Sequence, residues 1–181
     1  PDKGAQITYV LNKAVAEDVP MSMEVLDASG RVVYTESTNA PKTECDSFIK
    51  KQLNRSEGAH AWNWNMRIGQ FDCIKELTMT NRDLSAYDAA PGKYQVRLKV
   101  GNFSQVQDFE VKIDPRIENS IPGAAAAYVE RDQLSASLLT GANEMARGVR
   151  YLRKVKEQLD FILTEATVKD LADGGKELNN K

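Results

Sequence analysis

The chain has 181 residues, a formal net charge of −2, 41% hydrophobic residues and 28% charged residues, which is ordinary for a globular domain. Residues 1–123 carry 15 Lys and Arg against 17 Asp and Glu, and residues 124–181 carry 9 against 9. Neither part is basic, so we expect no nucleic-acid partner, and no apolar run reaches the roughly 20 residues of a membrane span. Because the chain starts at Pro1 without a methionine, we interpret it as a piece of a longer, processed protein.

The first strands are predicted at residues 6–11, 21–26 and 31–35, where apolar residues alternate with polar ones. The Asp-Ala-Ser-Gly sequence at 27–30 lies between the second and third of these. Asp begins a turn readily, and Gly30 adopts a positive φ without steric cost. The sequence therefore predicts a β-hairpin over residues 21–35.

A strand with two tryptophans is predicted at residues 58–67. Trp62, Trp64 and Met66 alternate with polar residues and would share one side of the sheet, because side chains on a strand alternate with period two. These indoles could form a stacking platform for sugars, but we favour a buried position, since aromatic residues dominate such cores.

Two further strands are predicted after Pro91-Gly92, at residues 94–100 and 109–113, and Asp114-Pro115 ends the second. Residues 68–90 are interpreted as a long polar connection. About six strands joined by turns, with no helix between them, indicate an antiparallel sandwich. Its predicted core consists of Trp62, Trp64, Met66, Tyr94, Val96, Leu98, Phe109 and Val111.

A long helix is predicted over residues 128–163, about 54 Å in length at 1.5 Å per residue. Gly141 and Gly148 lie inside it at a seven-residue spacing, which indicates either close approach of another element or a kink. A shorter second helix is predicted from about residue 165. Apolar residues at heptad spacing form the seam of the long helix, namely Leu138, Met145, Val149, Leu152 and Leu159.

A seam of this length needs a partner, because isolated helices are marginal in water. We favour an intramolecular hairpin with the second helix. That helix would cover only part of the seam, so contact with the sandwich, a homodimer through the long helix and contact with an absent part of the parent protein remain alternatives.

The candidates for chemistry are few. His60 is the only histidine and has no nearby partner in the sequence for proton transfer or metal binding. Acidic residues gather in the 68–90 connection, but they lack the register of an EF-hand calcium loop. We therefore interpret the acidic residues as solvated and predict no catalytic, cofactor or metal site; they are Asp72, Glu76, Asp83 and Asp88.

Cys45 and Cys73 are the only cysteines, and their spacing of 28 residues fits no metal motif. In an exported protein the two could pair, but two free thiols are an equal alternative.

Five segments in order resemble the C-terminal region of bacterial BNR/Asp-box (sortilin-type propeller) proteins described as glycosyl hydrolases. Four are short motifs and the fifth is the long helix with its trailing partner. The short motifs are VLDASGRVV at 25–33, GAHAWNWNMR at 58–67, APGKYQVRL at 90–98 and FEVKIDPR at 109–116. The resemblance implies a β-propeller upstream, then an immunoglobulin- or fibronectin III-like sandwich, then a helical hairpin.

The Asp-box pattern of the propeller itself is absent, so no catalytic carboxylate can be carried over. The sandwich alone is also similar to that of flagellar hook-capping proteins. We therefore expect a segregated α+β fold, with an Ig/FnIII-like sandwich at 1–115, a linker at 116–123 and a helical hairpin at 124–181 whose second helix is short.

The expected function is that of a non-catalytic accessory module of a secreted, periplasmic or cell-surface propeller protein. It would pack on the upstream propeller, space it, or mediate association. One alternative is a carbohydrate-binding module that holds a polysaccharide through Tyr87, Trp62 or Phe71. The other is a cell-surface or flagellar assembly domain.

Overall fold

The computed structural model describes residues 4–39, 53–75 and 85–165, and in these ranges the strands precede the helices. This arrangement confirms the segregated α+β prediction: antiparallel sheets come first and one long helix follows. The elements are β1 (Ala5–Leu11), β2 (Met21–Asp27), β3 (Val32–Ser37), β4 (Gly58–Trp64), β5 (Arg67–Gln70), β6 (Ser85–Asp88), β7 (Gly92–Val100), β8 (Phe103–Val111), α1 (Pro115–Ser120) and α2 (Ala124–Glu165).

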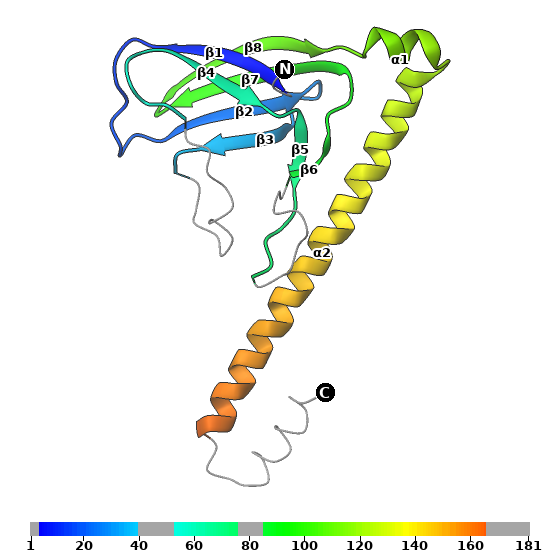
Figure 1. Ribbon diagram of the computed structural model, residues 1–181. Coiled ribbons are helices and arrows are strands. Elements are labelled where there is room, and N and C mark those ends of the chain that lie inside the picture. Colours follow the sequence, from blue (N-terminus) through cyan, green and yellow to red (C-terminus); the bar gives the residue numbers. More distant parts are fainter. Residues whose placement is uncertain (1–3, 40–52, 76–84, 166–181) are drawn as a thin grey trace.

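The strands form three antiparallel sheets (Figure 1). The largest has the order β3-β2-β7-β8, while β1 pairs with β4 and β5 pairs with β6. The β2–β3 hairpin turns as expected, since Gly30 has a φ of 80° and its N–H donates to Asp27 O at 2.9 Å. The Asp27 carboxylate also accepts from the Ser29 and Arg31 backbone N–H groups, which closes the turn.

The core lies between the β1–β4 pair and the four-stranded sheet. Trp64 is fully buried, and its ring lies 5.7 Å from that of Tyr94 and 5.9 Å from that of Phe109. Burial raises the pKa of Tyr94 to about 12, and the hydroxyl donates to Ala90 O at 2.9 Å. Of the residues predicted for the core, Trp62, Trp64, Tyr94 and Val96 are buried, and Met66, Leu98, Phe109 and Val111 are partly buried against them.

The tryptophan strand is shorter than predicted. It ends at Trp64, and Met66 lies at a corner with a φ of 57°, a left-handed conformation that is uncommon outside glycine. Asn65 Oδ1 accepts from Arg67 N at 3.1 Å, and Trp64 Nε1 donates to Arg67 O at 3.1 Å. These bonds turn the chain from β4 into β5, so Met66 does not continue the alternation of the strand.

Two segments interpreted as irregular contain regular structure. The 68–90 connection overlaps β5 and β6, which are only four residues long each. The linker at 116–123 overlaps α1, whose first turn is stabilised by Asp114, because its side chain accepts from Arg116 N. Hydrogen bonds from the Arg116 guanidinium lower the pKa of Asp114 to about 2.

A buried acidic residue, Glu24, lies on the side of β2 that faces away from the core. Its carboxylate accepts from Arg97 and, at 2.9 Å, from Lys99, both on the neighbouring strand β7. Burial alone would raise the pKa of Glu24, but the hydrogen bonds from Lys99 and Arg97 outweigh it and the pKa lies below its ordinary value. The ion pairs thus cross-link two central strands.

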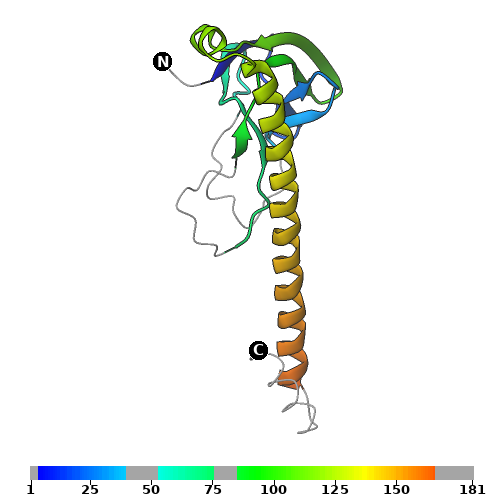
Figure 2. The same cartoon turned by 90° about the vertical axis from the view of Figure 1, so that its right-hand side faces the viewer.

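The long helix α2 has 42 residues, or about 63 Å at 1.5 Å per residue. It passes β5 and β6 and continues beyond the sheets (Figures 1 and 2). It runs unbroken through Gly141 and Gly148, so the kink is not found. Neither helix in the described part of the chain has the length and apolar character that a bilayer crossing requires. The predicted second helix lies outside the described residues.

Candidate functional site: the two sides of the long helix

The tryptophans are engaged inside the sandwich. Trp62 is 6% exposed, and its indole N–H donates to the buried Glu36 carboxylate at 2.8 Å. Trp64 is 0% exposed. Tyr87 and Phe71, the other aromatics considered for sugar stacking, are half-buried. The two indoles therefore offer no open ring surface to a sugar.

The polar residues considered for chemistry have ordinary partners. Ser56 O accepts a hydrogen bond from His60 Nε2 at 2.7 Å, and the His60 ring lies 5.3 Å from that of Tyr9. Asp88 lies 3.8 Å from Arg67, and Asp72 pairs with Arg150 at 2.8 Å. Glu76 and Asp83 lie outside the described residues. Within the described ranges, no three His, Cys, Asp or Glu side chains gather in a way that could hold a metal ion.

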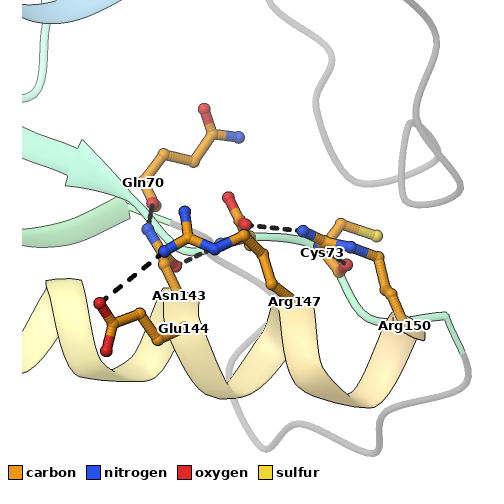
Figure 3. Close-up of polar contacts among 7 residues, drawn as sticks. Gln70, Cys73, Asn143, Glu144, Arg147 and Arg150 are labelled. Carbon is orange, nitrogen blue, oxygen red and sulfur yellow. Dashed lines mark hydrogen bonds and ion pairs between the residues drawn. The ribbon is translucent and has the colours of Figure 1, made fainter. Parts of the chain in front are cut away.

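The backbone of residues 70–75 runs along the inner side of α2, where three helix side chains bind it. Figure 3 shows two of these side chains, Asn143 and Arg150. Asn143 accepts from Asp72 N at 2.7 Å and donates to Gln70 O at 3.1 Å. We call Asn143, Arg150 and Arg153, together with the 70–75 segment that they bind, the latch.

The two arginines of the latch lie further along the helix. Arg150 donates to Cys73 O at 2.9 Å and to the Asp72 carboxylate at 2.8 Å, and Arg153 donates to Lys75 O at 2.7 Å. Over about three turns, α2 thus binds neighbouring residues of one segment. Such bonds fix direction, because four of the five go to backbone groups rather than to a mobile side chain.

The latched segment also contains Cys73, which is disulfide-bonded. Cys45, the other cysteine of the chain, lies outside the described residues. A disulfide restricts the conformations that a segment can adopt. The segment that holds α2 is therefore itself covalently restrained.

A second set of contacts holds α2 closer to its start. Arg131 donates to Asp88 O at 2.8 Å and to the Asp132 carboxylate at 2.9 Å, and its guanidinium lies 4.9 Å from the centre of the Tyr128 ring. Ala124 and Ala146 are buried, at 7% and 3% exposure. The buried and hydrogen-bonding residues on the side of α2 that meets the sandwich are therefore mostly small or polar.

The opposite side of α2 is apolar and exposed. Met145 and Leu152 each follow a latch residue by two positions, which places them about 160° around a helix of 3.6 residues per turn. They are 74% and 67% exposed. We call the row that contains them the outer stripe. It comprises Leu134, Leu138, Gly141, Met145, Gly148, Leu152, Val155, Leu159 and Ile162.

The predicted seam residues are thus distributed between two sides. Leu138, Met145 and Leu152 are exposed on the outer stripe, and Leu159 is half-exposed there. Val149 is half-buried and lies closer to the sandwich. At both glycines an added Cβ would meet no atom within 4 Å, so no element of the described chain approaches them.

Sequence reasoning did not identify the latch. Asn143, Arg150 and Arg153 bind mainly backbone carbonyl and N–H groups, and these leave no mark in the sequence. The one available signal was the i, i+3 spacing of Arg147, Arg150 and Arg153, which indicates a basic row on one side of a helix.

No protein-family model matches the chain, and a search of the curated proteins finds no match.

Proposed function

We infer that the chain is a non-catalytic scaffold module, in which the β-sheet region holds one long helix as a rigid arm for association. The observation that carries this function is the latch: α2 is bound to the 70–75 backbone on one side and presents large apolar side chains on the other.

The rigidity of the arm follows from the way in which it is held. An isolated helix is marginal in water, and tertiary contacts supply most of its stability. Here the contacts are made by Arg131 near the start of α2 and by the latch from Asn143 to Arg153. Two separated points of attachment fix both the position and the direction of a helix.

The setting of the module is part of the proposal. The disulfide at Cys73 supports an exported protein, because disulfides persist in oxidising compartments. The motif order that resembles propeller proteins supports a place after a β-propeller, where the arm would space the propeller or join it to a partner.

A measurement of distance across the molecule tests the arm. Spin labels at Val10 and Phe161, both well exposed, report the separation of β1 from the far part of α2. We expect one narrow distance distribution, and we expect Asn143→Ala with Arg150→Ala to broaden it. Glu144→Ala with Arg147→Ala is the matched control, since that pair is exposed and 4.0 Å apart on α2 alone.

A broad distribution in the unaltered protein would contradict the rigid arm. Turnover of a glycoside or peptide substrate by the purified chain, abolished by a single substitution, would contradict the non-catalytic function.

A further inference from the structure

We propose, building on the rigid-arm function, that the outer stripe binds the same stripe of a second copy of this chain as an antiparallel coiled coil. The starting observation is the spacing of the stripe. Its members follow one another at intervals of four and three residues without interruption, which is the heptad pattern of two helices in contact.

The heptad assignment separates large residues from small ones. The four residues at a positions are all large, whereas the five at d positions include both glycines. The a positions are Leu138, Met145, Leu152 and Leu159, and the d positions are Leu134, Gly141, Gly148, Val155 and Ile162.

This separation selects the antiparallel direction. In a parallel pair each position meets its own copy, so Gly141 and Gly148 would each face glycine and leave two layers without side chains. In an antiparallel pair a positions face d positions. With Met145 opposite Gly148 of the second copy, Leu152 lies opposite Gly141. Leu138 then meets Val155, so large residues fill the space above small ones.

The charge of the helix favours the same direction. Residues 124–145 carry one basic and three acidic side chains, whereas residues 146–165 carry five basic and three acidic ones. An antiparallel pair places the acidic half of each helix beside the basic half of the other, and it opposes the two helix dipoles favourably.

The apolar area is sufficient for a reversible dimer. The seven large residues of the stripe offer roughly 100 Å² each. The total is about 1,200 to 1,400 Å² over two copies, at the lower end of specific interfaces, which begin near 1,200 Å².

A second copy matches the stripe along its length. The stripe spans 29 residues, or about 42 Å of helix, and an identical helix that runs antiparallel offers an apolar row of the same length.

Sedimentation of the full chain over a range of concentrations tests the association. We expect a monomer–dimer equilibrium. The double variant Leu138→Lys with Met145→Lys removes four apolar side chains per dimer. The loss of each weakens dimerisation by a factor of roughly ten, so the dissociation constant should rise about 10⁴-fold. The control, Gln133→Lys with Thr140→Lys, adds the same charge with the same spacing at exposed positions outside the stripe. It should leave the dissociation constant within a few-fold of that of the unaltered chain.

Cross-linking tests the direction. Chains with Leu134→Cys and chains with Leu159→Cys are mixed and oxidised mildly. An antiparallel dimer gives the mixed product between the two variants, whereas a parallel dimer gives only each variant linked to itself. The mixed product supports the proposal, and self-linked products alone would overturn it.

A chain that stays monomeric at all concentrations would also overturn the dimer. The arm would survive that result if the Val10–Phe161 distance distribution remained narrow, so failure of the dimer and failure of the scaffold function are distinguishable. The Leu138→Lys, Met145→Lys variant should keep the helix content of the unaltered chain, which separates lost association from lost folding.

Discussion

The sandwich and the long helix both contain apolar residues at regular spacing, but these residues are buried in the sandwich and exposed on the helix. In the sandwich, the apolar sides of β2, β4 and β7 meet one another, and Trp64 and Met23 are almost completely buried. In α2, mostly small and polar residues meet the rest of the chain, while Leu138 and Met145 remain 66% and 74% exposed. A periodic apolar row therefore identifies a surface that requires a partner, without identifying the partner.

The strongest contrast is between two large aromatic residues. Trp64→Ala should lower the free energy of unfolding by about 3–5 kcal/mol, because it empties a filled position in the core. Tyr151→Ala, at a position that is 68% exposed on α2, should change it by no more than about 0.5 kcal/mol. Denaturant unfolding in dilute solution measures both, and equal effects would show that Tyr151 is covered.

The ion pairs of Glu24 stabilise the sheet in a pH-dependent way. Since the pKa of Glu24 is lowered in the folded state, its contribution is complete above the unfolded value of about 4.3 and is lost as the pH falls through the folded value. Glu24→Gln should cost roughly 1.5–3 kcal/mol at neutral pH.

The difference between this variant and the unaltered chain should shrink as the pH falls below about 4.3. Unfolding followed by tryptophan fluorescence measures it. A difference that stayed constant down to acid pH would show that the charge of Glu24 does not stabilise the sheet.

Two glycines allow the same substitution to be compared in the sheet region and in the long helix. At Gly4, which has a φ of 146°, an added Cβ would lie 2.4 Å from Trp64 O, whereas at Gly148 it would meet nothing. Gly4→Ala should therefore destabilise the sheets by more than about 1 kcal/mol.

Gly148→Ala should instead stabilise the helix by up to about 1 kcal/mol in dilute solution, since alanine is the better helix former. Circular dichroism during unfolding measures both substitutions. A destabilised Gly148→Ala variant under these conditions would mean that another part of the same chain approaches the helix there.

The sheet region was largely predictable because its strands and turns are determined by residues that are close together in the sequence. Alternation around Trp62 and Trp64, and the Asp27–Gly30 turn, each depend on neighbouring residues. Prediction was wrong at Met66 because a corner with a left-handed residue has no such signature. It missed β5 and β6 because strands of four residues are too short to show a period.

The sequence predicted that the long helix exists, but it did not predict how the helix is attached to the rest of the chain. Heptad spacing indicated α2 and its row of apolar residues. The side that meets the sandwich is set by Asn143, Arg150 and Arg153, whose partners are largely backbone groups of residues 70–75. Such contacts depend on the path of a distant segment, which the local pattern of a helix does not contain.

Oxidative footprinting of the methionines tests the central claim most directly, because both regions report from one sample. Met23 is 1% exposed and Met145 is 74% exposed. Met23 should be protected at every protein concentration, while Met145 should be oxidised quickly in dilute solution and become protected as the protein is concentrated. Protection of Met145 in dilute solution, or rapid oxidation in concentrated solution, would contradict a stripe that is left free within the chain and covered by a second copy.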